Sequence, residues 1–454
     1  MIRDALVPDE SRIYAWIEEV FGHGVRRPGY PADRWAEGWL QEQFRAFGLE
    51  RVRAEPVEMP YWEPRAASLV VTGADGATAD IACFPLPFTA PGETEADLVA
   101  FDETLPDAAR SAVALCDAPL MRIPHSWYAS VATWHYDPDA SFDGTRQILP
   151  FGRAVMEATR PAIDAGAAGF IGALTDYPGD SCRYYVPYDA QRRDIKAVWV
   201  SGSDGKRLRE MLAACPVRAR MSVDAAEGDI TCYNSVGELP GADEETVIIG
   251  SHHDGPWSSA VEDGSGIALV LAQAAYWSRV PEAERPHRLV FLLNSGHMAG
   301  GSGQATFVST HRADLDRCVL EVHLEHAANE FSDEGGTLHA SGQPEARWWF
   351  TTRINRLEAA VRSAIESEDL RRSFILRPDI FGPKPTTDGA DFHLAGVPLV
   401  NFLTAPFYLF DEMDTLDKIH RPSLVPVTRA AIRIVESTAG VSAAAMRADA
   451  VDVS

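Results

Sequence analysis

The feature that most constrains the fold is a set of three short apolar runs, each followed by imidazole or carboxylate side chains. The runs cover residues 247–250, 289–293 and 319–324, and they alternate with segments of helical pattern. That alternation is typical of a parallel β-sheet with helices between its strands. Ligands of open α/β sheets bind at the carboxyl ends of the strands, so acids and imidazoles repeated there predict a metal site.

The side chains at these strand ends suit a hydrolytic metal site. Such a site needs three or four His, Asp or Glu ligands, an open position for water, and a nearby group that handles a proton. Any single candidate could instead satisfy a strand end or cap a helix, so the signal lies in their recurrence at separate strand ends. The candidates are His252, Asp254, Glu262, Asp263, His297, Glu325 and His326.

Other chemistries have less support in the sequence. The chain has no GxSxG nucleophile elbow, no GxGxxG dinucleotide motif and no HExxH zinc motif. Its six cysteines contain no CxxC pair, so a thiolate zinc cluster is not expected.

Composition and charge exclude some classes of partner. The formal net charge of −25 would repel nucleic acid and anionic membrane surfaces. No run approaches the eighteen apolar residues of a membrane-spanning helix, and the first residues lack the pattern of a secretory signal. We therefore expect a cytoplasmic protein that binds neither nucleic acid nor membrane. The oligomeric state stays open, a homo-oligomer included.

The length of 454 residues predicts two domains. Two amphipathic helices open the chain, the pattern changes near residue 60 to short β-like runs separated by turns, and the α/β pattern returns after residue 227. We expect a discontinuous domain of residues 1–59 and 228–454, interrupted by an inserted domain of residues 60–227. Within the second part we expect a long helix over residues 346–366 and a strand over 398–403.

Several of these motifs resemble metallopeptidase family twenty-eight, which includes dinuclear zinc aminopeptidases, glutamate carboxypeptidases and related glutaminyl cyclases. GSHHDG (250–255) is similar to the family's His-x-Asp strand end, and VEDGSG (261–266) to its acid-acid-x-x-Gly helix start. LEVHLEHA (320–327) and TDGADFHLAGVPLVNF (387–402) are similar to the segment with a later ligand and to an SDHxxF stretch. FDEMDTLDKI (410–419) resembles the closing His-x-x-x-Asp-Thr segment.

The resemblance implies an α/β fold. The main domain would have three layers, with a mixed, mostly parallel sheet and helices on both faces. The insertion, residues 60–227, would be a β-rich α/β protease-associated domain.

The resemblance also implies that one of the family's two metal positions is kept. His252, Glu262 and Glu325 fall on the ligands of that metal, and all three residue types bind metals. Glu262 and Glu325 stand where the family has Asp, so each of these side chains is longer by one methylene group. We therefore expect a single divalent ion per chain, with zinc favoured over manganese or iron.

The ligands that belong only to the second metal are missing. The family's Glu-Glu pair falls on Ser295-Gly296, or on His297-Met298 if the turn is shifted, and its closing His falls on Phe410. Neither Gly296, Met298 nor Phe410 can hold a metal. The general base of the family is lost with the pair, and His297 is the nearest residue able to accept a proton.

We therefore expect a metal-dependent hydrolase of an amide or peptide-like bond, of aminopeptidase, carboxypeptidase or amidohydrolase type. Its substrate would be a small molecule or a peptide-like amide. His297 would act as base or as a fourth ligand, and Asp254 would orient His252. Asp263 and Asp388 would support the ligands from behind.

The substrate contacts expected from the inserted domain and from the stretch after His252 are Arg183, Tyr185 and Trp257. Arginine favours carboxylate recognition, although in so acidic a chain it could equally pair with a surface acid. Two alternatives stay open: a catalytically inactive binding or scaffolding protein, and a cyclase or lyase reaction on the same site.

Overall fold

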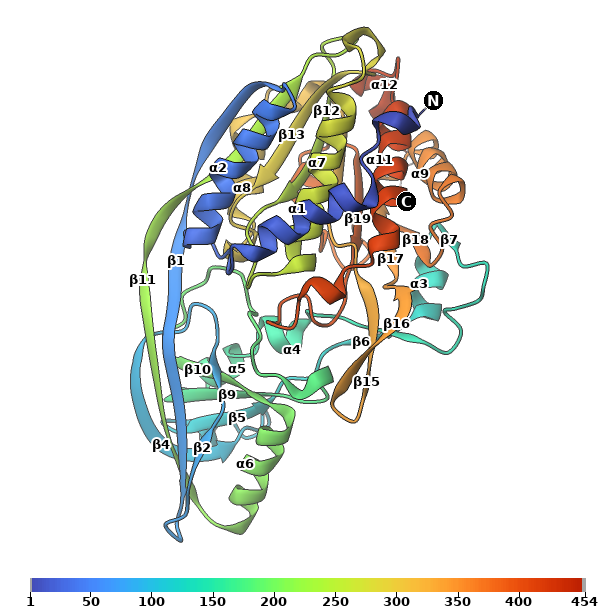
Figure 1. Ribbon diagram of the computed structural model, residues 1–454. Coiled ribbons are helices and arrows are strands. Elements are labelled where there is room, and N and C mark those ends of the chain that lie inside the picture. The colour runs from blue at the N-terminus through green and yellow to red at the C-terminus, as the bar shows by residue number, and fades with distance from the viewer. Residues whose placement is uncertain (1, 451–454) are drawn as a thin grey trace.

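A ribbon of two very long antiparallel strands joins a larger and a smaller lobe in the computed structural model, which describes residues 2–450 (Figure 1). The strands are β1 (Glu50–Gly73) and β11 (Val217–Leu239). The chain leaves the larger lobe along β1 and returns along β11. The predicted domain boundaries, after residues 59 and 227, therefore lie close to one another within this ribbon.

The larger lobe contains a mixed, largely parallel sheet, which confirms the predicted α/β fold class. Its central strands β12, β13, β14 and β19 run parallel, whereas β11 and β17 run antiparallel to their neighbours. The order across the sheet is β11, β13 (Arg288–Asn294), β12 (Thr246–His252), β14 (Cys318–Leu324), β19 (Leu399–Thr404), β17 (Arg347–Thr351), β18 (Ser373–Leu376) and β7 (Trp134–Tyr136).

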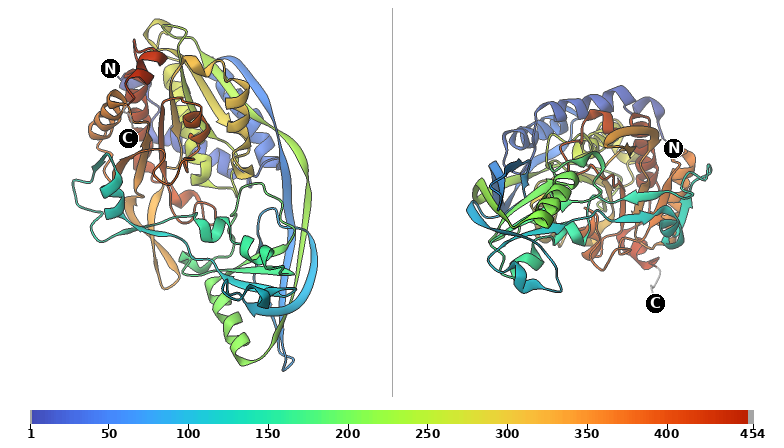
Figure 2. Two further views of the ribbon diagram at one scale, coloured as in Figure 1. Left: turned by 180° about the vertical axis from the view of Figure 1, so that it is seen from behind. Right: turned by 90° about the horizontal axis from the view of Figure 1, so that it is seen from below.

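Helices cover both faces of this sheet, and the strand residues alternate between them. Val247 and Ile249 of β12 belong to the same core as α1 (Glu10–Gly22), α2 (Pro31–Ala46), α7 (Gly266–Trp277), α9 (Asn355–Ser367) and α11 (Leu424–Glu436). Ile248 faces the other way, towards α8 (Ser302–Thr310) and α10 (Ala390–Leu394), which Figure 2 shows from behind. Since both faces are covered, these strands read as continuous apolar runs.

The chain order places a topological switch point at the carboxyl end of β12. After β12 the chain passes through α7 to β13 on one side, and then through α8 to β14 on the other side of β12. A crevice forms where neighbouring connections leave a sheet in opposite directions, and ligands of α/β proteins bind there. His252 is the last residue of β12 and therefore lies at this point.

The smaller lobe is a β-rich α/β unit that continues the same sheet beyond β11. Its helix α6 (Gly202–Ala214) directly follows a buried strand. Its strands are β4 (Gly92–Ala100), β5 (Val113–Asp117), β9 (Gly169–Leu174), β10 (Lys196–Ser201) and β3 (Phe84–Pro85), with β2 (Thr78–Ile81) beside β1.

Part of the predicted insertion packs on the larger lobe. Residues 122–148 form a small hairpin of β6 (Arg122–Pro124) and β8 (Arg146–Ile148), the helix α3 (His125–Val131), and β7, which pairs with the edge strand β18. Tyr128 of α3 is fully buried, with its ring 5.1 Å from that of Trp348. This segment therefore forms the end of the main sheet.

The prediction of a helix over residues 346–366 is wrong for the first residues of that range. Residues 347–351 form β17, and α9 begins only at Asn355. The aromatic run Trp348–Phe350 is buried in the middle of the sheet, an environment that favours aromatic residues in strands. The strand predicted over residues 398–403 is found as β19. Within residues 2–450, no helix is long and apolar enough to cross a membrane.

Candidate metal centre

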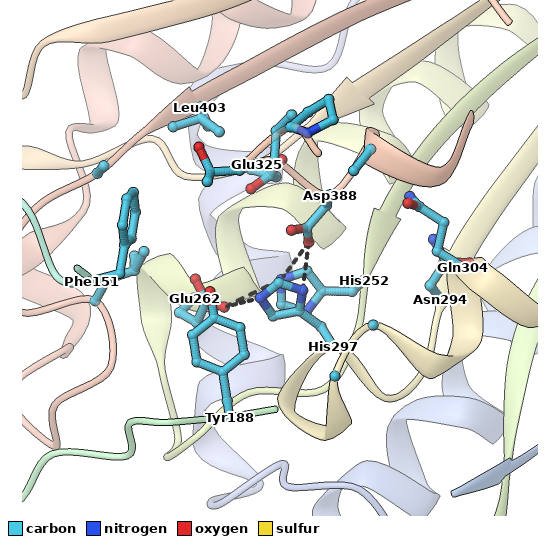
Figure 3. A pocket seen from close by; sticks show the side chains of 18 of the residues that line it. Phe151, Tyr188, His252, Glu262, Asn294, His297, Gln304, Glu325, Asp388 and Leu403 are labelled. Atoms are coloured by element: carbon cyan, nitrogen blue, oxygen red, sulfur yellow. Dashed lines mark ion pairs between the residues drawn. The ribbon is translucent and has the colours of Figure 1, made fainter. Parts of the chain in front are cut away.

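Five ionisable side chains from different strand ends and loops face one cavity of about 370 Å³ (Figure 3). His252 ends β12, Glu262 lies in the irregular turn Ala260–Ser265 before α7, and His297 follows β13. Glu325 directly follows β14, and Asp388 precedes α10. The switch point therefore brings together residues that are up to 136 positions apart, from His252 to Asp388.

His252 presents one ring nitrogen to the cavity. Its Nδ1 donates to the backbone carbonyl of Asp254 at 2.8 Å, which directs Nε2 into the cavity. That Nε2 lies 3.4 Å from Glu262 Oε1 and 3.4 Å from Asp388 Oδ2. The ring also stacks on that of His297, with centroids 4.3 Å apart.

Glu262 is held from both its backbone and its side chain. The carboxylate of Asp414 accepts from the backbone N–H groups of Val261 and Glu262 at 2.9 and 2.8 Å, which fixes the turn. The Glu262 carboxylate lies 2.6 Å from His326 Nε2. Burial alone would raise the pKa of Glu262, but His326 and His252 lower it to about 2, so the group is a carboxylate.

His297 is the most accessible of the imidazoles at the site, with 16% of its side chain exposed. Its Nδ1 lies 3.0 Å from Asp388 Oδ2 and its Nε2 lies 3.6 Å from Glu262 Oε1. The turn that carries it is held by Asp254, whose carboxylate accepts from the backbone N–H groups of His297 and Met298 at 3.1 and 2.7 Å. Asp254 therefore positions the His297 turn as well as His252.

Glu325 lies in the same cavity but has a different set of partners. Its Oε1 accepts from Asn401 Nδ2 at 2.6 Å, and its Oε2 lies 3.7 Å from His326 Nε2. Burial, and then the neighbouring Asp388, raise the pKa of Glu325 to about 7. Its ligand atom groups with those of His323 and Asp388 within 4.8 Å, whereas His252 and Glu262 group with His297.

Asp263, predicted to support the ligands, lies behind them. One of its carboxylate oxygens accepts from the Ser251 hydroxyl and the other from the backbone N–H of Gly266 at 3.0 Å. It stays 3.9 Å from His252 Nε2. Burial raises the pKa of Asp263 to about 6.

The donor set fits a divalent cation. The buried atoms His252 Nε2, both Glu262 carboxylate oxygens, His326 Nε2 and Asp388 Oδ2 make no hydrogen bond of normal geometry within residues 2–450. Ligands about 2.0–2.1 Å from a tetrahedral zinc ion lie about 3.3 Å from one another. The distances of 3.4 Å from His252 Nε2 to Glu262 and to Asp388 match that spacing.

The residues predicted to contact substrate lie away from this cavity. Arg183 forms an ion pair with Glu412 at 2.7 Å, and its guanidinium lies over the ring of Trp257. Trp257 and Tyr185 are buried, and Trp257 Nε1 donates to the carbonyl of Phe410. None of the three belongs to the cavity lining that the described residues form. The aromatic residues form a packed cluster at this point.

Sequence motifs do not reveal several residues that do line the cavity. Phe151, Met156 and Tyr188 come from the inserted segment, and Lys384 comes from the irregular loop before α10. The ring of Tyr188 lies 5.1 Å from that of His297 and 4.7 Å from that of Phe410. It therefore covers the side of the site where the family's closing His is replaced.

Residues 234–435, which contain this centre, match the model of "Peptidase family M28". This segment belongs to peptidase family M28. The M28 segment includes every ligand candidate described above. It does not include the inserted residues 60–227, whose resemblance to a protease-associated domain stays a prediction.

A curated relative of the M28 segment is a "probable leucine aminopeptidase 2" of Aspergillus oryzae, 28% identical over 216 residues. The match covers 42% of this chain and 40% of that protein, so the chain spans well under half the length of the relative it matches.

Two solved structures share the fold over nearly the whole chain. A peptidase M28 precursor of Shewanella amazonensis has a TM-score of 0.71 at 21% identity, covering 94% of this chain and 93% of that one. A zinc aminopeptidase of Bacillus subtilis has a TM-score of 0.68 at 16% identity, covering 99% of this chain and 100% of that one.

Proposed function

We propose that the chain is a metal-dependent hydrolase of a peptide-like amide bond that works with one divalent ion. The observation that carries the proposal is the convergence of buried imidazole and carboxylate groups from His252, Glu262 and Asp388 on one cavity, with His252 Nε2 3.4 Å from each carboxylate. Membership of residues 234–435 in an M28 peptidase family supports the reaction class. Imidazole and carboxylate ligands suit zinc, and manganese or iron as well.

His252 and Glu262 are the two ligands that sequence and geometry share. Asp388 is the third ligand best placed by distance, since its Oδ2 lies 3.4 Å from His252 Nε2. Glu325, the third ligand expected from the sequence, accepts from Asn401 through Oε1, and its Oε2 lies 3.7 Å from His326 Nε2. The two assignments make different predictions: the ion should be lost when the carboxylate of the true third ligand is replaced by an amide.

A divalent ion at this position supplies Lewis acidity, which polarises a substrate carbonyl and makes a water more acidic. The protein supplies the proton acceptor. His297 is held by Asp388 through Nδ1, which leaves Nε2 towards the cavity, so the imidazole is placed to take a proton from a water. Asp388 stabilises the imidazolium that forms, and Asp254 keeps the turn in place.

The cavity wall indicates how the substrate is held. Phe151 and Leu403 form an apolar side, whereas Asn294 and Gln304 form a polar side (Figure 3). An apolar side chain next to the scissile bond would pack against the first side. The backbone amides of a peptide-like substrate would pair with the second.

Metal content together with turnover tests the proposal. Protein purified without chelator should hold one divalent ion per chain and hydrolyse aminoacyl or N-acylated amides with added Zn²⁺, Mn²⁺ or Fe²⁺. His252→Ala should lose both the ion and turnover, while His135→Ala, an exposed imidazole on β7, should lose neither. A protein that binds no divalent ion would refute the proposal. A loaded protein without turnover on any of these amides would favour a binding protein.

A matched pair of variants decides the third ligand. Asp388→Asn should release the ion if Asp388 is the ligand, and Glu325→Gln should then keep it. The reverse result would assign the ligand to Glu325. Because both changes remove one charge and keep the shape of the side chain, a difference in metal content reports coordination.

A further inference from the structure

A second group of ligand-type side chains lies on the opposite side of β12 from the cavity. Asp33 and Glu37 are four residues apart on α2 and therefore share one face of that helix. Cys232 faces them from β11, and each of the three contributes one ligand atom to a group within 4.8 Å. His253 joins them because successive residues at the end of a strand point to opposite sides. We call Asp33, Glu37, Cys232 and His253 the α2 cluster.

The cluster is completely enclosed. Asp33, Cys232 and His253 are 0% exposed, and Glu37 is 6% exposed. Asp33 Oδ2 accepts from the backbone N–H of Gly29 at 2.7 Å, and His253 Nε2 donates to the carbonyl of Tyr233 at 3.0 Å. These two bonds direct the other ligand atom of each side chain into the cluster.

The inward atoms of Asp33 and His253 face each other as an ion pair and have no other polar partner of normal geometry among the described residues. Asp33 Oδ1 and His253 Nδ1 lie 3.1 Å apart. A buried donor or acceptor left in this way costs free energy, so native structures seldom keep one without a reason. A separation near 3 Å is also what two ligands of one tetrahedral ion show.

We propose that the α2 cluster is a zinc-type site that binds one divalent ion through Asp33, Glu37 and Cys232, whose ligand atoms lie within 4.8 Å of one another. His253, with Nδ1 at 3.1 Å from Asp33 Oδ1, would be the fourth ligand. A sulfur ligand beside an imidazole and carboxylates selects zinc or cobalt over magnesium and calcium, which take oxygen ligands. Four protein ligands leave no open position, which is the mark of a structural site. Arg34, 3.1 Å from Glu37, balances the third negative charge.

Binding at this site requires the thiol of Cys232 to lose its proton. Burial, and then Asp33, raise the pKa of that thiol, so it is protonated while no ion is present. The proton passes to solvent as the sulfur–metal bond forms, and His253 binds as the neutral imidazole. The site then ties α2 and β11 to the residue that follows His252, and so fixes the end of β12.

Cobalt substitution tests the site without relying on activity. A Co²⁺–thiolate bond gives a charge-transfer band in the near ultraviolet, and the ligand groups around His252 contain no cysteine among the described residues. Full-length protein loaded with Co²⁺ should show the band. Cys232→Ser should lose the band and one Co²⁺ per chain, while Cys318→Ser, another buried strand cysteine, should keep both.

Asp33→Asn is a second test of the site in case Cys232→Ser misfolds, because asparagine keeps the shape of the aspartate side chain. It should lower the Co²⁺ content by one per chain while the circular dichroism spectrum stays unchanged. Wild-type protein that binds Co²⁺ without the band, or a band that persists in Cys232→Ser, would overturn the proposal and leave a plain Asp33–His253 ion pair. Since no ligand group around His252 contains a cysteine among the described residues, the band can be present or absent whether or not the His252 centre hydrolyses amides.

Discussion

At the scale of single residues, the candidate metal centre depends on carboxylates that accept hydrogen bonds from backbone N–H groups as well as contacting imidazole rings. Asp254 accepts from two consecutive N–H groups of the His297 turn, and Asp414 does the same for the Glu262 turn. Such contacts place side chains that approach from different strands. The sequence predicted His252 and Glu262 as ligands and Asp388 only as a support behind them. The direct approach of Asp388 to His252 could not be predicted, since a long irregular loop carries it.

The turn held by Asp254 should move when one of its oxygens becomes an amide. Asp254→Asn sets an N–H group against a backbone N–H, and hydrogen bonds to a charged group contribute about 1.5–3 kcal/mol. We expect kcat to fall roughly tenfold or more, with the bound metal retained. Turnover of metal-loaded variant and wild type measures this, and unchanged kcat would show that the turn does not need the carboxylate.

His297 should matter to proton transfer and little to metal content. Removing a general base typically costs about 10²–10⁴ in rate. We therefore expect His297→Gln to lower kcat by that order while the metal stoichiometry stays as in wild type. Loss of the ion in this variant would instead identify His297 as a ligand, the other role predicted from the sequence.

At the scale of elements, the buried parallel strands were predictable because apolar runs mark them. The pattern fails where a strand lies within a segment that also suits a helix, as at residues 346–351. Local pattern also does not reveal that Trp134–Tyr136 of the predicted insertion form β7 at the edge of the main sheet. Pairing with β18 gives that segment its structure, and pairing between distant segments is not visible in local pattern.

The packing of α3 against the sheet should contribute measurably to stability. Tyr128 is fully buried against Trp348 and Phe374, so Tyr128→Ala should lower the free energy of unfolding by about 3–5 kcal/mol. Its hydroxyl has no hydrogen-bond partner among the described residues, so Tyr128→Phe should change stability little. Denaturant unfolding of both variants tests this, and equal losses would place the hydroxyl in an interaction.

At the scale of the whole molecule, the α2 cluster is a candidate site that sequence motifs do not reveal. Search patterns for zinc look for paired cysteines, whereas this cluster takes single residues from a helix, a strand and a strand end. The same holds for Tyr188, which reaches the active centre from the insertion. Sites built from distant segments exist only once the chain has folded.

Stability of the whole chain should depend on pH through Glu345. Burial, and then Glu330, raise the pKa of Glu345 to about 7, above the unfolded value near 4.5. The folded protein therefore holds a proton that the unfolded chain loses, so Glu345 should lower the free energy of unfolding as pH rises from about 4.5 to 7, by roughly 2–3 kcal/mol. Glu345→Gln should remove that slope. A pH series of unfolding curves checks it, and an unchanged slope would exclude Glu345 as its source.

The ribbon of β1 and β11 has a mechanical consequence. Two lobes connected by flexible peptides can swing apart, but here the connection is itself sheet, hydrogen-bonded from Glu50 and Glu238 to Gly73 and Val217. A wide hinge motion would break hydrogen bonds between β1 and β11. We therefore expect the lobes to twist slightly but not to open widely. Their separation should remain nearly constant, so that the residues which the insertion contributes to the cavity, Phe151 and Tyr188 among them, stay in place.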